Sequence, residues 1–254
     1  SAIRDFSVYE PLSVEDQQLK YGASDVGTNL LIVSANTIVS RVYHLNRFNL
    51  SGLRRPEIFG TSTNLFGKAY YYNFYSSNGS ITLFLPKFYE YFKYTNVTAG
   101  IGEAYTGVVL LSNDEFFLNR IEAYVMKNQF AEANAGLEYL FSLRTQGYNA
   151  ATDKITEANI ADMYPVIADE YTPFYTLTPL QASYIKAIAE ARRREYIQEG
   201  LRWFDIKRFN LVVEHITKEN GKAVRTNVLV KDDKRRALQI PQRASDNGIE
   251  KNPR

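Results

Sequence analysis

The chain has 254 residues, of which 45% are hydrophobic and 23% are charged, so it can bury a sizeable core and is globular in composition. The formal net charge is only +2, from 30 basic and 28 acidic side chains, which argues against a nucleic-acid-binding surface. The lack of cysteine excludes disulfides, thiolate metal sites and cysteine nucleophiles, and no apolar run approaches the roughly 20 residues of a membrane-spanning helix.

The first part of the chain favours short β-elements. Asn29–Val33 is an apolar run that predicts a short buried strand. The runs 68–75 (Lys-Ala-Tyr-Tyr-Tyr-Asn-Phe-Tyr) and 81–85 (Ile-Thr-Leu-Phe-Leu) favour β-structure, and the turn signal Ser-Ser-Asn-Gly at 76–79 joins them into a predicted hairpin. The glycines at 100, 102 and 107 predict a loop.

A helical region follows. Ser112–Glu115 has the form of a capping box, and apolar residues then recur at helical spacing as far as Val125. A second helix begins at Phe130, and we expect Gly147 to end it. Helices joined this closely pack antiparallel. Four residues also have the spacing of a tetratricopeptide-type hairpin: Tyr124, Phe130, Ala133 and Leu137.

Further helices are predicted beyond residue 177. Thr178-Pro-Leu-Gln181 is a second capping box with proline at the first helical position, and the helix that it starts is expected to stop at Gly200. Trp203–Phe209 predicts one more short helix. From Asn210 onward the sequence indicates an extended or irregular tail.

The densest motif spans residues 190–209, Glu-Ala-Arg-Arg-Arg-Glu-Tyr-Ile-Gln-Glu-Gly-Leu-Arg-Trp-Phe-Asp-Ile-Lys-Arg-Phe. Three consecutive arginines alone suggest a phosphate site, but glutamates interleave with them, and Glu190 and Arg194 have the favourable order of a helical ion pair. Asp205 is placed to receive an arginine once the chain turns back. We therefore interpret six residues as architectural: Arg194, Glu199, Gly200, Arg202, Trp203 and Asp205.

This motif resembles the signature of the SusD/RagB family, approximately Glu-Arg-Arg-x-Glu followed by Glu-Gly-x-Arg-Trp-x-Asp-Leu-x-Arg. Residues 199–206 are in register with it, and Ala191 departs from it. Residues 114–124 resemble the family's helix Glu-x-x-Leu-x-Arg-Ala-Glu-Ala-Tyr. Leu-Gln-Ile-Pro-Gln at 238–242, with Asn247 and the later Asn252-Pro253, resembles its closing Ile-Pro and Asn-Pro segments. The resemblance covers residues 112–254 well and the earlier residues only in general character.

The resemblance implies a function. Members are surface nutrient-binding lipoproteins of Bacteroidetes, which capture oligosaccharide and pass it to a SusC-like TonB-dependent transporter in the outer membrane. They are usually longer and carry a lipid on an amino-terminal cysteine. The chain opens with Ser1-Ala-Ile-Arg and has neither feature, so we expect a mature or trimmed, soluble carboxy-terminal portion. The resemblance implies no cofactor.

Motifs typical of enzymes and metal sites are missing from the sequence. His44 and His215 are far apart and belong to no zinc or nucleophile motif. Asp232-Asp233 lacks the ligand spacing of a calcium loop, and Gly100-x-Gly102 lacks the lysine of a phosphate loop. No pair of carboxylates is singled out for glycoside hydrolysis. We therefore expect no catalysis and no metal.

Aromatic residues are the best functional indication in the sequence itself. The chain has 19 tyrosines and 15 phenylalanines, and flat rings stack on the apolar faces of sugars. In a strand, residues 70, 72 and 74 would share one face and 71, 73 and 75 the other, one in the core and one open to ligand. A second cluster lies among prolines near residue 173. The candidate ligand-binding residues are Tyr70, Tyr72, Tyr75, Tyr171 and Tyr175.

These observations predict a mainly α fold with irregular and short β segments, in which a tetratricopeptide-like hairpin packs on a loop-rich SusD-type carboxy-terminal region. We expect one structural unit with three regions, the aromatic-rich 1–111, the helical 112–209 and the extended tail 210–254. The leading function is capture of oligosaccharide at the cell surface. Two alternatives stay open: peptide capture, as in the RagB branch, and a helical-repeat scaffold that binds protein only.

Overall fold

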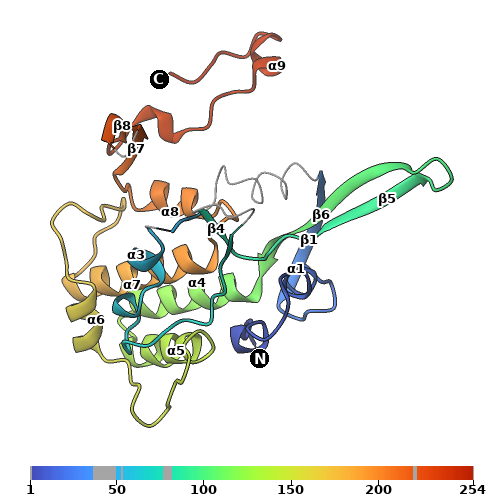
Figure 1. The fold of residues 1–254 in the computed structure, drawn as a ribbon. Helices are drawn as coiled ribbons and strands as arrows, with labels where there is room; N and C mark the ends of the chain where they lie inside the picture. The colour runs from blue at the N-terminus through green and yellow to red at the C-terminus, as the bar shows by residue number, and fades with distance from the viewer. Residues whose placement is uncertain (1, 37–49, 53, 77–81, 220–221, 254) are drawn as a thin grey trace.

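Three helices form the centre of the molecule (Figure 1). The computed structural model describes residues 2–36, 50–52, 54–76, 82–219 and 222–253. The central helices are α4 (Asn113–Met126), α5 (Phe130–Ser142) and α7 (Pro179–Glu195). α4 packs against both α5 and α7, and the side chains of Leu118, Ile121, Leu137 and Tyr184 at these contacts are fully buried. The predicted mainly α fold with short β segments is confirmed, while the tetratricopeptide likeness of the α4–α5 hairpin stays a prediction.

Both helix starts predicted from capping boxes are confirmed, and the full reciprocal box is formed at Thr178. Thr178 Oγ1 accepts a hydrogen bond from the Gln181 amide at 3.2 Å, and Gln181 Oε1 accepts one from the Thr178 amide at 2.9 Å, with Pro179 in the first turn. Ser112 Oγ likewise accepts from the Glu115 amide at the start of α4. Each cap satisfies an amide that has no partner inside its helix.

Two helices end earlier than predicted, α5 because the chain after it pairs with another segment and α7 because the backbone after it turns left-handed. After α5 the chain joins residues 69–71: the Tyr71 amide donates to Arg144 O, and the Gln146 amide donates to Ala69 O, both at 2.9 Å. This pairing ends the helix before Gly147. α7 ends at Glu195 because Gln198 (φ 72°) and Gly200 (φ 79°) adopt left-handed backbone, which no α-helix can contain. The short helix α8 (Arg202–Arg208) follows, as predicted.

A β-arm projects from the helical body (Figure 1). It is an antiparallel sheet of β1 (Asn29–Asn36), β6 (Ile101–Ser112) and β5 (Glu90–Asn96), in the order β1-β6-β5. The predicted strand at Asn29–Val33 is therefore present but not buried. Leu30 and Leu31 are 47% and 48% exposed, because no helix layer covers this part of the sheet.

The loop predicted from three glycines is wrong, since two of them lie within β6. A Cβ atom on Gly102 would come within 2.3 Å of Lys93 O and 2.7 Å of the Phe92 ring, so this glycine permits the close cross-strand contact. Only Gly100, with φ 65°, occupies the turn before the strand.

The predicted tyrosine hairpin is formed only at its far end. β3 (Tyr75–Ser76) pairs with β4 (Thr82–Phe84), which also pairs with β2 (Leu50–Ser51). Most of the predicted turn, at 77–79, lies outside the described residues. Lys68–Phe74 does not continue the strand, apart from an isolated bridge between Tyr70 and Thr145.

The carboxy-terminal tail extends away from the body (Figure 1). It contains the hairpin β7 (Val213–Glu219) and β8 (Lys222–Leu229). The two segments of the closing motif meet within it. Gln239 Oε1 accepts a hydrogen bond from the Asn252 amide at 2.8 Å, and Asn252 Nδ2 donates to Leu238 O at 2.6 Å.

The remaining elements are short. They are η1 (Phe6–Val8), α1 (Val14–Tyr21), α3 (Arg55–Phe59), η2 (Thr61–Thr63), α6 (Glu157–Met163), η3 (Lys234–Arg236) and α9 (Gln242–Ser245). Among the helices of the described residues, none is long and apolar enough to cross a membrane.

Candidate functional site

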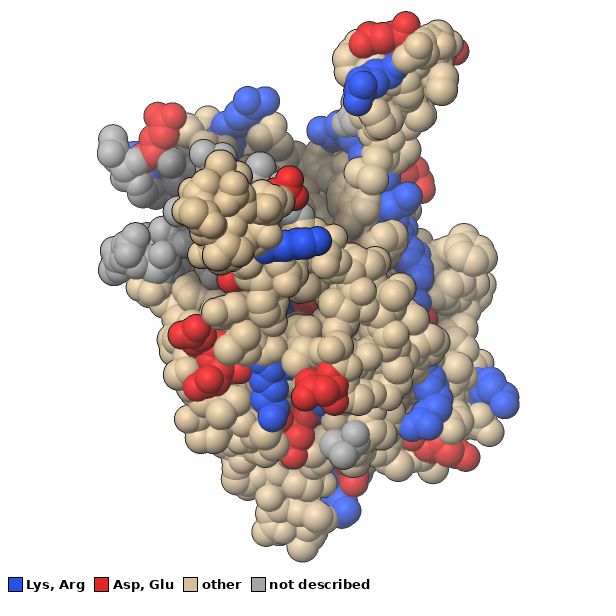
Figure 2. Space-filling model, turned by 90° about the vertical axis from the view of Figure 1, so that its right-hand side faces the viewer, with Lys and Arg blue, Asp and Glu red and all other residues tan. Residues whose placement is uncertain are grey.

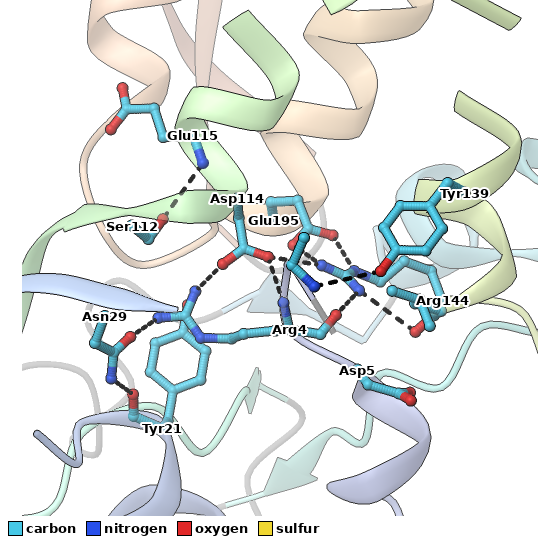
Figure 3. A network of polar contacts seen from close by, with 12 residues as sticks. Arg4, Asp5, Tyr21, Asn29, Ser112, Asp114, Glu115, Tyr139, Arg144 and Glu195 are labelled. Carbon is cyan, nitrogen blue, oxygen red and sulfur yellow. Dashed lines mark hydrogen bonds and ion pairs between the residues drawn. The ribbon is translucent and has the colours of Figure 1, made fainter. Parts of the chain in front are cut away.

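A buried network of charges lies where the amino-terminal segment meets the helical body (Figure 3). Arg144 binds Glu195 through two nitrogens, at 2.7 and 2.9 Å, and reaches Asp114 at 3.1 Å. Arg4 binds the other oxygen of Asp114 at 2.6 Å. All four side chains are at most 4% exposed, so the network joins the amino-terminal segment to α4 and α7 inside the protein.

Electrostatics keep the signature carboxylate Glu195 ionised. Burial alone would raise the pKa of Glu195, but the charge and hydrogen bonds of Arg144 and a hydrogen bond from Tyr72 outweigh it and lower the pKa. Burial, followed by the charge of Glu195, raises the pKa of the Tyr72 hydroxyl, so Tyr72 stays a donor to Glu195. The two arginines and the two carboxylates thus balance each other's charge, and the network serves to hold the fold together.

Other carboxylates of the 190–209 motif are also engaged. Glu199 accepts from the Lys87 ammonium and from the Tyr21 hydroxyl, the latter at 2.7 Å. Asp205 receives Arg192, whose Nε lies 3.1 and 3.4 Å from the two carboxylate oxygens, so the expected arginine does reach Asp205.

The expected helical pair of Glu190 with Arg194 is replaced by other contacts. Glu190 lies 3.3 Å from both Arg193 and Arg202. Arg194 instead points inward, where it donates to Ile58 O at 3.4 Å. The reason is the turn at Gly200, which brings Arg202 back beside Glu190.

The motif's turn ends in a half-buried tryptophan. The turn requires a left-handed backbone at Gly200, which glycine adopts without strain. Trp203 follows in the first turn of α8. Neither residue lines a hollow among those described below.

A hollow of about 530 Å³ opens beside α3 and the tyrosine run, a volume within the range of small-molecule sites. Its lining comes from α3, η2, the tyrosine run and β4. The residues used below are Arg55, Phe59, Thr61, Tyr70, Tyr72 and Leu83.

Aromatic rings form the floor of this hollow. The Phe59 ring makes edge contacts with Tyr70, Tyr72 and Phe74, at centroid distances of 6.3, 5.1 and 4.7 Å. The Arg55 guanidinium lies 5.1 Å from the centre of the Phe74 ring, a cation–π distance. The rings therefore hold the arginine at the hollow.

The structure separates the five predicted tyrosines. Tyr70 and Tyr72 line the hollow, but they are only 7% and 5% exposed, so their rings are mainly core and offer little surface to a ligand. Tyr75 is half-buried, and its hydroxyl accepts a hydrogen bond from Gln17 at 2.9 Å. Tyr75, Tyr171 and Tyr175 are not among the residues that line the hollow.

The second predicted cluster is a partly open loop. Tyr171 packs against Phe209, at a centroid distance of 5.4 Å, and burial raises its pKa. Tyr175 is half-buried beside Phe174, whose side chain is 96% exposed. The most open ring of this loop is thus Phe174, which belongs to the second aromatic cluster expected from the sequence.

A comparison with protein-family models matches residues 52–248, well over half of the chain, to the SusD family. The chain belongs to the SusD family. No curated protein and no solved structure matches it. The matched region contains the hollow and the 190–209 motif, but it excludes Arg4 and Tyr21. SusD-family proteins bind nutrients such as glycans at the cell surface and are generally non-catalytic.

The sequence pattern missed two residues of the hollow in this SusD-family chain, Arg55 and Phe59. The available signal was Arg54-Arg55-Pro56, because proline in a first helical turn marks a helix start and so places the arginines at a helix end. Phe59 gave no comparable signal, since an isolated aromatic residue predicts burial in the core.

The histidines and the Asp232-Asp233 pair considered in the sequence form no common site among the described residues. His215 is exposed on β7, Asp232 bonds Asn210 at 3.0 Å, and His44 lies outside the described residues. Within the described part of the chain, no group of three or more His, Asp or Glu residues could hold a metal ion. On the face shown in Figure 2, basic and acidic side chains are interspersed with uncharged ones, so that face carries no continuous basic surface.

Proposed function

We propose that this SusD-family chain binds an oligosaccharide without converting it and helps deliver it to a SusC-like TonB-dependent transporter of the outer membrane. Membership of the family supports capture of nutrient at the cell surface. The observation that supports a particular binding site is the hollow at Arg55 and Phe59.

The hollow has the mixed lining that sugars need. Sugars present apolar faces ringed by hydroxyl groups, so a site combines aromatic or aliphatic surface with a few polar groups. Here the half-buried side chain of Leu83 and the small exposed edge of Phe59, which is 8% exposed, supply the apolar surface, whereas Arg55 and Thr61 supply hydrogen-bonding groups. The predicted tyrosines would act mainly by holding Phe59 in place, and Tyr171 and Tyr175 would belong to a separate surface.

A groove on the α4–α5 hairpin favours a protein-binding scaffold as the second candidate. It has a volume of about 400 Å³ and is lined in part by Phe117, Tyr124 and Gly136. Gly136 lets the helices approach so closely that a Cβ atom there would lie 2.7 Å from Ile121. Peptide capture remains a third candidate, because the hollow could also hold an amino-acid side chain.

A glycan array followed by isothermal titration calorimetry tests the proposal. The protein should bind at least one class of oligosaccharide, and Phe59→Ala should weaken that binding by about 1–3 kcal/mol, the range for an aromatic contact. Phe117→Ala in the groove is the matched control. Binding of protein or peptide partners with no glycan bound at all would favour the other two candidates.

A further inference from the structure

Among the described residues that line the hollow, Arg55 is the only one with a charged side chain. We propose that the hollow binds the anionic group of an acidic oligosaccharide, a sugar chain that bears carboxylate groups. This inference rests on the proposed function, and it adds the chemical class of the ligand.

Arg55 is available to a ligand, whereas its neighbour Arg54 is not. Arg54 Nη1 lies 2.9 and 2.6 Å from the two oxygens of Glu57, so these two charges neutralise each other in solvent. Arg55 has its contact with the Phe74 ring, and no carboxylate of the described residues pairs with it. A ring contact fixes a guanidinium without using its hydrogen-bond donors, so these donors can face an anion.

A second positive charge lies behind the floor of the hollow. The Arg194 guanidinium is 5.3 Å from the centre of the Tyr70 ring, on a side chain only 3% exposed. It donates to neutral oxygens, those of Ile58 at 3.4 Å and of the Tyr164 hydroxyl at 3.5 Å. Glu190 also acts on Arg194 through its charge, but it is itself engaged by two other arginines.

The remaining charges near the floor cancel. Glu195, at the Tyr72 hydroxyl, is held by Arg144 at 2.7 and 2.9 Å and so contributes little net field. No Asp or Glu is among the described residues that line the hollow. A low-dielectric floor with arginine at the rim and arginine beneath attracts an anion more strongly than the same charges would in water.

The geometry also favours carboxylate over a bare charge. A planar guanidinium matches a carboxylate in paired hydrogen bonds, and Leu83 with the exposed edge of Phe59 offers the apolar surface for the sugar that carries it. Neutral sugars could use the floor, but they would leave the Arg55 charge unmatched.

Calorimetric titration of the protein with trigalacturonate, and with its fully methyl-esterified form, tests the inference. The two ligands share one sugar chain and differ in charge. Trigalacturonate should bind the more tightly, and Arg55→Gln should weaken its binding roughly 10- to 100-fold, the range for losing a charged hydrogen bond. Arg54→Gln is the matched control and should leave the affinity unchanged. Raising the salt from about 50 to about 500 mM should weaken trigalacturonate more than its ester.

The possible outcomes are distinct. Equal binding of the charged and esterified forms, or equal loss in the Arg55 and Arg54 variants, would overturn the anionic inference and leave glycan binding standing. Tighter Arg55-dependent binding of triglutamate than of trigalacturonate would overturn it in favour of an acidic peptide. A preference for a heparin-derived tetrasaccharide would replace carboxylate by sulfate ester and so also overturn the stated class. Failure of all sugars on the array would overturn the proposed function itself.

Discussion

Arg192 and Asp205 face each other across the turn at Gly200, with Nε 3.1 Å from one carboxylate oxygen and 3.4 Å from the other. The two side chains are 6% and 2% exposed. The contact joins α7 to α8 inside the protein, while Gly200 at the turn between them is exposed. Four of the five arginines in the motif therefore pair with the motif's own carboxylates, and Arg194 is the exception.

Removing Asp205 should damage folding more than ligand binding. Asp205→Ala leaves Arg192 buried without its carboxylate, so the free energy of unfolding should fall by about 3–5 kcal/mol in urea titrations. Glu57→Ala, which breaks the exposed pair with Arg54, is the control and should cost less than about 1 kcal/mol. Unchanged stability of Asp205→Ala together with lost ligand binding would make this corner a binding site instead.

Arg194 should behave as a structural residue as well. Arg194→Ala removes donors to Ile58 O and the Tyr164 hydroxyl and opens space under the Tyr70 ring. We expect a loss of about 2–4 kcal/mol in the free energy of unfolding. The loss is measured by comparing the thermal unfolding of this variant with that of Arg193→Ala, a change at a half-buried position. Equal melting temperatures would contradict the expectation.

Stability should fall in acid because of Glu195. Its pKa lies below the usual value of 4.5, because Arg144 and Tyr72 outweigh the opposing effect of burial. A carboxyl group whose pKa is lower in the folded state stabilises the fold fully above its unfolded pKa. That stabilisation is lost as the pH falls below 4.5 and through the folded pKa. The unfolding free energy of Glu195→Gln should therefore depend less on pH below 4.5 than that of the wild type. An unchanged slope would show that Glu195 is not the group that titrates.

The tyrosine run should divide into core and surface positions. Tyr70→Ala and Tyr72→Ala remove rings that are 7% and 5% exposed, so each should lower the free energy of unfolding by about 3–5 kcal/mol. Tyr71→Ala and Tyr75→Ala, at half-buried positions, should cost less. Equal losses at all four positions in denaturant titrations would contradict this division.

Phe174 should affect ligand binding rather than stability. Its side chain is 96% exposed, so Phe174→Ala should change stability by less than about 0.5 kcal/mol. If the loop of Tyr171 and Tyr175 contacts the glycan, the same variant should weaken glycan binding in calorimetry. Unchanged affinity would restrict the ligand to the hollow at Arg55.

Glycans that bind should not be hydrolysed, because the described residues that line the hollow include no carboxylate that could act as acid or base. The measurement is the release of reducing ends from each bound glycan over a day with purified protein. Release that scales with protein concentration and disappears on mutation of one carboxylate would identify an enzyme.

The sequence by itself determined the helix starts, because the residues that form each cap are neighbours in the chain. Thr178 and Gln181 form their capping box because both halves lie within four residues, and Ser112 starts α4 for the same reason. The order and spacing of the 190–209 motif were likewise enough to indicate the SusD family, which the family match confirms.

Only the tertiary structure decided which side chains share a site. Arg144 finds Glu195 from 51 positions away, and Arg4 finds Asp114 from 110 positions away, which no local pattern encodes. The sequence suggested that Gly102 lies in a loop, but in the structure it lies in the sheet, where the Phe92 ring covers it. The sequence of the tyrosine run suggested a ligand-binding surface, but in the structure Phe59 and Glu195 enclose Tyr72. Burial depends on distant partners, so sequence can nominate aromatic residues, but only packing decides which of them meet solvent.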